Sequence, residues 1–174
     1  RLYRVVRLAA KEVGKQVRFD IVGGGVEVDR GVLDRMTAAF EHLLRNGVTH
    51  GIESPEQRAA AGKDPVGRIT MSLVQEGNEV CVELRDDGAG LDLGRIHERA
   101  VAMGLIPGGV VVADAVLTDL IFAPGLSTAA VLSEVAGRGV GMDVVESDVQ
   151  SLGGRIEIRS ETGRGTCFKL VLPL

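Results

Sequence analysis

The feature that most constrains the fold is a set of segments in which apolar and polar residues alternate, arranged as two pairs with a short turn inside each pair. They lie at residues 67–75 and 79–85, around Gly77-Asn78, and at residues 155–159 and 166–171, around residues 162–165. Alternation with a period of two is typical of strands with one buried face, and short turns join antiparallel neighbours. The sequence therefore predicts two β-hairpins.

Helical patterns separate and flank these hairpins. Apolar residues recur at helical spacing in residues 4–13, 29–51, 92–103, 113–122 and 141–152. Asp29 is the candidate N-cap of the longest helix, residues 16–22 read as a further strand, and residues 54–64 read as a loop with one helical turn. This order predicts an α+β fold, a two-layer sandwich with helices on one face of a mixed, mostly antiparallel sheet.

Composition limits the class of protein. The 174 residues fit a single domain covering residues 1–174, and 45% of them are hydrophobic, enough for an aliphatic core. The net charge of −4 argues against nucleic acid as the main partner, and no apolar run predicts membrane insertion. Cys81 and Cys167 lie far apart without metal-ligand spacing, which favours free thiols in the cytoplasm. Because the chain starts at Arg1, we expect a fragment of a larger protein, monomeric by itself.

Three polar residues follow one side of the longest predicted helix. His42, Asn46 and His50 are spaced four residues apart, away from the main apolar stripe. An asparagine oxygen suits a Mg²⁺ ion already held by phosphates, and histidine can donate to phosphate oxygens or accept a proton. The alternative interpretation is a solvated helix face that happens to contain two histidines.

An acidic turn follows the second strand of the first hairpin. It reads Asp86-Asp87-Gly88-Ala89-Gly90. Two carboxylates would repel phosphate, but a carboxylate can accept a hydrogen bond from an exocyclic amine such as that of adenine, and glycines let the backbone approach a flat ring. An ordinary Asp-Gly turn is the alternative interpretation.

Two further glycine motifs lie near the C-terminus. Gly137-Arg138-Gly139-Val140-Gly141 runs into a predicted helix, so its N–H groups could form a phosphate cradle at a positive helix end, with added charge from Arg138. Gly163-Arg164-Gly165-Thr166 lies between the last two strands, and by itself it indicates a hairpin turn.

Taken in order, these motifs resemble the GHKL ATPase superfamily, which contains gyrase, Hsp90, histidine kinases and MutL. Residues 41–53 look like the N box of CheA-type kinases, and residues 122–128 resemble their F box and lid segment. Gly137 to Val145 is similar to their G2 box, and Gly163 to Phe168 to their final glycine motif. The likeness extends from Asp29 to Leu174. The Glu41-His42 start and the Gly-Thr-Cys-Phe ending resemble kinases of the Chp type, from type IV pilus systems.

The resemblance implies a Bergerat fold, ATP and Mg²⁺ as cofactors, and a role for each motif residue. The catalytic residues would be His42, near the γ-phosphate, and His50, on the terminal phosphates. Asn46 would help to coordinate Mg²⁺, and Asp87 would bind the adenine amine. The remaining nucleotide-binding residues would be Gly88, Gly90, Gly137, Arg138, Gly139, Gly141 and Thr166. A lid would span about residues 105–138, and the basic residue that the family carries in the helix after the acidic turn is either Arg95 or Arg99.

The implied activity is transfer of the ATP γ-phosphoryl group to a histidine on a separate domain, in chemotaxis or pilus motility. The implied partners are a histidine phosphotransfer domain, a response regulator, a coupling protein and a receptor array. His97 reads as a solvated residue rather than the acceptor. Thr49 and Gly47 depart from the family pattern, which normally has Asp and Ala or Ser there. Two alternatives stay open: a GHKL ATPase that hydrolyses ATP, with Glu41 near the base position, and an ATP-binding pseudokinase or nucleotide sensor.

Overall fold

The computed structural model describes residues 1–23, 30–126 and 141–173. The helices of this part are α1 (Leu2–Val13), α2 (Arg30–Asn46), α3 (Pro55–Ala60), α4 (Leu93–Ala102), α5 (Asp114–Asp119) and α7 (Met142–Ser151). Two short helices complete them: the π-helical turn η1 (Gly47–Gly51) and the 3-10 turn η2 (Leu120–Phe122). The strands are β1 (Val17–Val22), β2 (Gly67–Glu76), β3 (Glu79–Asp86), β4 (Arg155–Glu161) and β5 (Gly165–Pro173).

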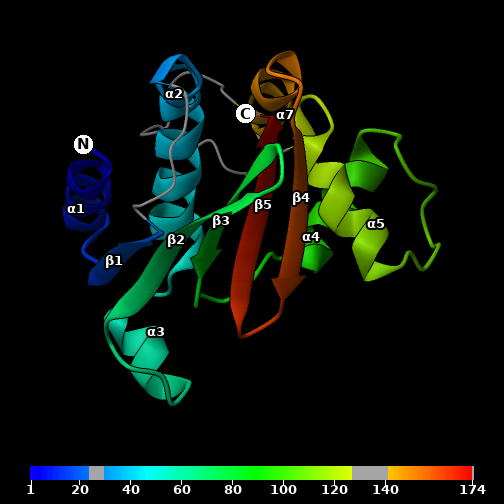
Figure 1. The fold of residues 1–174 in the computed structure, drawn as a ribbon. Helices are drawn as coiled ribbons and strands as arrows, with labels where there is room; N and C mark the ends of the chain where they lie inside the picture. Colours follow the sequence, from blue (N-terminus) through cyan, green and yellow to red (C-terminus); the bar gives the residue numbers. More distant parts are fainter. Residues whose placement is uncertain (24–29, 127–140, 174) are drawn as a thin grey trace.

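In the described residues the strands form one mixed sheet in the order β1-β2-β3-β5-β4 (Figure 1). Strand β1 runs parallel to β2, and every other neighbouring pair is antiparallel. Both predicted hairpins are confirmed, as β2–β3 and β4–β5. Tertiary structure adds the pairing of β3 with β5, which brings the end of the first hairpin beside the start of the last strand.

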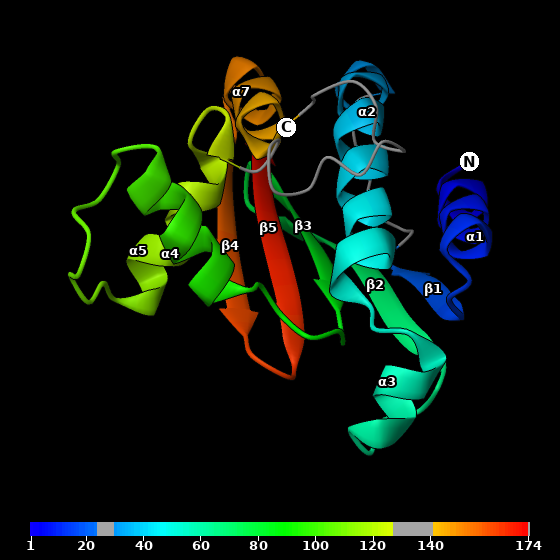
Figure 2. The same ribbon diagram turned by 180° about the vertical axis from the view of Figure 1, so that it is seen from behind.

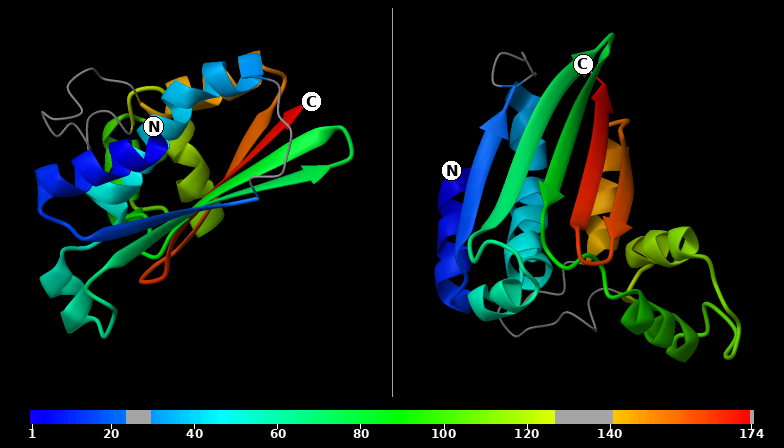
Figure 3. Two further views of the ribbon diagram at one scale, coloured as in Figure 1. Left: turned by 60° about the vertical axis from the view of Figure 1, so that its left-hand side comes forward. Right: turned by 90° about the horizontal axis from the view of Figure 1, so that it is seen from below.

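One face of the sheet is covered by helices (Figures 2 and 3). Helices α1, α2 and α7 lie on this face, and their apolar stripes meet the inward-facing residues of the strands. Met36, Leu44 and Val149 are examples from the helices, and Val80, Val82 and Leu170 from the strands, all at most 2% exposed. Each such side chain contributes about 1.5–3 kcal/mol of hydrophobic stabilisation. The predicted two-layer α+β sandwich is confirmed.

The remaining helices lie at the margins of this sandwich. Helix α3 lies beyond one end of β2, and α4 and α5 project to the side, beyond β4 (Figure 1). Across the parts of the chain that the structure describes, no helix has the length and apolarity to cross a membrane.

Two predicted segments differ from the structure. The longest helix does not continue as a regular α-helix to Gly51: it ends at Asn46, and η1 follows, closed by a hydrogen bond of 2.8 Å from the N–H of Ile52 to the carbonyl of Gly47. Residues 54–64 contain the complete helix α3, which starts with Pro55 after a capping box between Ser54 and Gln57. The predicted cap Asp29 lies outside the described residues.

Candidate nucleotide site

A pocket of about 380 Å³ lies between the helical layer and the edge where β3 and β5 meet α4. Its volume falls in the range of roughly 300–1,000 Å³ that small-molecule sites occupy. Its polar lining residues include Asn46, His50, Asp86, Asp92, Arg95, Arg99 and Thr166. Its apolar walls include Leu91, Ile96, Ile121, Leu126, Met142 and Phe168.

Asp86 is the carboxylate of the acidic turn that lines this pocket. It is the last residue of β3, and its Oδ1 accepts hydrogen bonds from the N–H groups of Gly88, at 2.9 Å, and Thr166, at 3.3 Å. Burial, assisted by the nearby charges of Asp87 and Glu53, raises the pKa of Asp86 to about 6, although the two N–H donors oppose this shift. Near neutral pH the group is therefore a fixed carboxylate acceptor at the end of an apolar slot.

Asp87, the residue that the sequence predicted to face a base, does not line the pocket. Its carboxylate pairs with the guanidinium of Arg58 at 3.1 Å and accepts the N–H of Arg68 at 2.8 Å. Arg58 is only 1% exposed and also binds Glu53 at 2.9 Å, while Lys63 binds Glu53 at 2.7 Å. Asp87 therefore belongs to a charge network around the buried Arg58, behind the turn.

Strand alternation was the signal that could have separated the two aspartates. Val80, Val82 and Leu84 alternate along β3 and all point into the core. Asp86 continues the same series, so its side chain falls on the helix-covered face, whereas Asp87 is one residue out of step.

The glycines of the acidic turn have different roles. Gly88 was predicted to bind the nucleotide, but it does not line the pocket. It packs behind Asp86, where a Cβ would collide with the carbonyl of Gly51. Gly90 does line the pocket. Thr166 also lines it, and its hydroxyl lies 3.2 Å from that of Ser160, which accepts the N–H of Leu91 at 2.8 Å. These bonds hold the segment after the turn against β4 and β5 at one end of the pocket.

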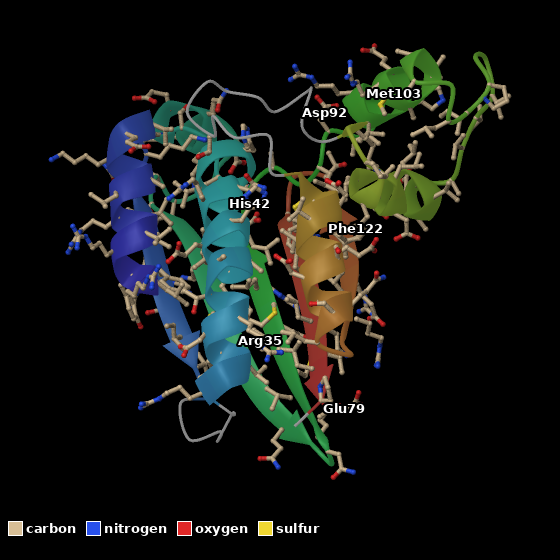
Figure 4. All side chains as sticks on the ribbon, turned by 90° about the horizontal axis from the view of Figure 1, so that it is seen from above. Arg35, His42, Glu79, Asp92, Met103 and Phe122 are labelled. Carbon is tan, nitrogen blue, oxygen red and sulfur yellow. The ribbon has the colours of Figure 1, made fainter. Side chains whose placement is uncertain are left out.

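The three polar residues of the long helix are brought to the opposite end. Asn46 and His50 line the pocket, whereas His42, labelled on α2 in Figure 4, does not line it directly. The Asn46 amide nitrogen lies 3.2 Å from His42 Nε2 and 3.8 Å from Met142 Sδ, so both of its N–H groups have acceptors. The amide oxygen is then the Asn46 atom left for a cation or a ligand.

The pKa values of both histidines of this end are lowered, which favours the neutral imidazole. Burial lowers the pKa of His42, and the nearby charge of Arg45 lowers it further. Burial lowers the pKa of His50 as well, with added effects from Lys15 and Arg95. A neutral imidazole can accept one hydrogen bond and donate another.

Helix α4 contributes two cations to the pocket. Arg95 and Arg99 are four residues apart, so they lie on the same side of the helix, and both line the pocket. The Nε atom of Arg99 is buried without a protein partner within the described residues. The sequence left open which of these arginines belongs to the site, and the structure brings both there. His97, on the same helix, is 2.9 Å from the carbonyl of Val110.

Part of the predicted phosphate cradle falls outside the described residues. Gly137, Arg138 and Gly139 lie there, as does the part of the predicted lid from residue 127 to 138. Gly141 is described: it is buried and is the N-cap of α7, and its neighbour Met142 lines the pocket. The positive end of α7 therefore faces the same region as Asn46 and His50.

The pocket thus has two chemically different ends. One end combines a carboxylate with flat apolar walls, which suits a ring with an amine. The other combines an amide, a neutral imidazole and two guanidinium groups, which suits anionic oxygens. No group of three acidic, histidine or cysteine side chains that could hold a metal occurs in the described residues. A cation here would take the Asn46 oxygen and bring its other ligands with an anionic partner, as Mg²⁺ commonly does.

Comparison with known proteins agrees with this arrangement. Residues 31–174 match the family model of histidine kinase-, DNA gyrase B- and HSP90-like ATPases. The chain belongs to this family. It is 44% identical over 174 residues to chemotaxis protein CheA of Salmonella typhimurium and 41% identical over 176 residues to that of Bacillus subtilis. Each match covers 100% of this chain and 26% of the relative, so the chain spans about a quarter of their length.

Solved structures share the fold at low sequence identity. The histidine kinase domain of the blue-light activated kinase of Erythrobacter litoralis has a TM-score of 0.55 at 16% identity, covering 99% of this chain and 59% of that chain. The mycobacterial sensor histidine kinase MprB has a TM-score of 0.53 at 17% identity, with coverages of 99% and 91%. These matches concern the fold alone.

Proposed function

We propose that this chain is the ATP-binding catalytic domain of a CheA-type protein histidine kinase. The observation that carries the proposal is the two-ended pocket, with the Asp86 carboxylate at one end and Asn46, His50 and two arginines at the other. The similarity of the whole chain to one segment of each CheA relative, about a quarter of the relative's length, supports the same function. The substrate would be Mg-ATP, and the acceptor a histidine on a separate phosphotransfer domain.

In this proposal the base end of the pocket recognises adenine through Asp86. The exocyclic amine would donate to the Asp86 carboxylate, which the N–H groups of Gly88 and Thr166 already orient. The apolar side chains of Ile96 and Phe168 would contact the flat ring. Because these groups are fixed before binding, little ordering cost accompanies recognition.

The opposite end would hold the phosphates. Arg95, Arg99 and His50 would contact phosphate oxygens, the Asn46 oxygen would take one position on Mg²⁺, and the glycines from Gly137 to Gly141 would supply N–H groups. His42, which is held by a hydrogen bond with Asn46, would assist transfer of the phosphoryl group. Bound Mg²⁺ neutralises charge on the phosphates, and the protein residues position the γ-phosphoryl group for in-line attack.

The cellular setting is part of the proposal. A response regulator, a coupling protein and a receptor array would be the partners of the whole cytoplasmic protein. The signalling would serve chemotaxis or pilus motility, the second because residues 41–42 and 165–168 resemble Chp-type kinases.

One contact disfavours the ATPase alternative. Glu41 forms an ion pair of 2.8 Å with Arg1, so its carboxylate is engaged between α1 and α2. A hydrolytic enzyme would need that carboxylate in the pocket to activate water, and Glu41 does not line it.

The proposal can be tested by titrating the protein with a fluorescent ATP analogue, with and without Mg²⁺. Asp86→Asn should weaken binding by about 10- to 100-fold, the value of a hydrogen bond to a charged group. Asp87→Asn is the matched control and should retain the affinity. Equal affinity of Asp86→Asn and the unmodified protein would overturn the adenine assignment.

A second measurement separates the possible activities. The chain is incubated with radiolabelled ATP and a purified phosphotransfer domain from a CheA relative, and acid-labile phosphohistidine is counted. Label on the acceptor supports the kinase. Phosphate release without an acceptor would instead indicate an ATPase, and binding without either reaction a nucleotide sensor.

A further inference from the structure

The π-helical turn η1 connects the two ends of the pocket. His50, on this turn, lines the phosphate end, and the carbonyl of Gly51 accepts the N–H of Ala89 at 3.0 Å, which belongs to the Asp86 turn. A π-helical turn has a different hydrogen-bonding pattern from the helix before it, so its last carbonyls lack regular helical partners.

Lys15 supplies partners for two of these carbonyls. Its ammonium group donates to the carbonyl of Val48 at 3.1 Å and to that of Thr49 at 2.7 Å. The side chain is half-buried, and burial lowers its pKa although Glu53 opposes the shift. These bonds end on the main chain, directly before His50, so they constrain the backbone that carries this histidine.

The backbone of Lys15 is itself fixed by the end of α1. Gly14 adopts the left-handed conformation that closes a helix, with φ of 67°. The N–H of Lys15 then donates to the carbonyl of Ala10 at 3.0 Å. Ala10 is buried against the core. A continuous series of bonds therefore runs from α1 through Lys15 to the turn at His50.

We propose that Lys15 is a positioning residue that fixes the η1 turn and couples the end of α1 to the nucleotide pocket. The inference rests on the proposed function, because it concerns how His50 is presented to phosphate. A movement of α1 relative to α2 would be transmitted to His50 and, through Gly51, to the Asp86 turn.

The test replaces Lys15 with methionine, which keeps the length of the side chain but removes the donors. Lys11→Met, on the exposed face of α1, is the matched control. Lys15→Met should weaken binding of the ATP analogue by about tenfold, and Lys11→Met should leave it unchanged. Lys15→Arg, which can still donate to both carbonyls, should recover most of the affinity.

A double-mutant cycle with His50→Ala shows whether Lys15 acts through the turn. In that background Lys15→Met should have a smaller effect than in the unmodified protein, because one of the groups that it positions is gone and only its influence on the Asp86 turn is left. Full additivity of the two losses, or an unchanged affinity in Lys15→Met, would overturn the inference.

Amide hydrogen exchange without nucleotide provides a readout that does not depend on binding. Lys15→Met should accelerate exchange at Ile52 and Ala89, whose N–H groups bond to Gly47 and Gly51, and leave the strand amides protected. Acceleration throughout the protein would indicate a general stabilising role and contradict positioning. If the unmodified protein binds no ATP analogue, the proposed function fails, whereas the exchange result still decides what Lys15 does to the turn.

Discussion

Two walls of the pocket are held in place in different ways: the base wall, formed by the Asp86 turn, and the phosphate wall, formed by the η1 turn with His50. Behind the base wall, Arg58 is almost fully buried and binds Glu53, Asp87 and the carbonyl of Asp64, while Lys63 donates to the carbonyls of Asp87 and Gly88. On the phosphate wall, His50 lies on the η1 turn, and Lys15 donates to the two carbonyls directly before it. Within the described residues, the base wall is therefore braced by a charge network around the buried Arg58, and the η1 turn by the two bonds from Lys15.

This difference suits the proposed ligand. A flat base needs one fixed acceptor, and preorganisation makes a hydrogen bond to it effective. Phosphates must enter, react and leave, so the residues that contact them need room to adjust. The predictions below test the contrast between a rigid base wall and an adjustable phosphate wall.

The largest expected effect concerns the buried network. Arg58→Met should lower the free energy of unfolding by about 3–5 kcal/mol, because Glu53 and Asp87 lose their buried partner. Urea denaturation measures this change. Arg35→Met, at an exposed position of α2, is the control and should stay within about 0.5 kcal/mol. Similar losses in both variants would remove the argument that the network braces the base wall.

Asp86 should make stability depend on pH in a defined direction. Its pKa is about 6 in the folded protein against 3.8 for the ordinary group, so the folded state binds more protons between these values. Wild-type stability should therefore fall, relative to Asp86→Asn, as pH rises from about 4 to about 6, by roughly 3 kcal/mol in all. Urea denaturation of both proteins across pH 4–8 measures the difference. A difference in stability that stays constant with pH would mean that folding does not raise the pKa of Asp86.

A smaller effect is expected at the phosphate wall. Asn46→Ala should remove most of the gain in ATP affinity that Mg²⁺ provides, by about tenfold, because the contact of the Asn46 oxygen is lost. The affinity without Mg²⁺ should change much less. The ratio of dissociation constants with and without Mg²⁺ is the measurement. Asn78→Ala, in the β2–β3 turn, should keep the full gain. Equal losses with and without Mg²⁺ in Asn46→Ala would point to a structural role instead.

The smallest effect concerns the start of α3, the helix that carries Arg58. Ser54 accepts the N–H of Gln57 at 3.2 Å, and the Gln57 side chain accepts the N–H of Ser54. Ser54→Ala should cost about 1 kcal/mol of stability. Thermal unfolding measures it, with Ser151→Ala near the end of α7 for comparison. A loss as large as that of Arg58→Met would mean that the cap, rather than the charges, organises this wall.

Local sequence signals determined much of this protein. The hairpins, the helices and the spacing of the motifs follow from alternation, helical periodicity and turn residues, which act between near neighbours in the chain. These signals were enough for the α+β class and for the likeness to GHKL ATPases. They also brought Asn46, His50, Gly90 and Thr166 forward as site residues, and the structure gathers these four around one pocket.

Tertiary structure alone decided what depends on distant residues. The sequence predicted Asp87 as the carboxylate in the pocket, whereas the structure has Asp86 there. Arg58, 29 residues away, holds the side chain of Asp87 outside the pocket. The η1 turn and its bonds to Lys15 join residues 33 and 34 positions apart. Alternation along β3 could have placed Asp86 on the inner face, but burial and charge compensation are properties of the packed chain, so no local pattern reveals that Arg58 pairs with Asp87.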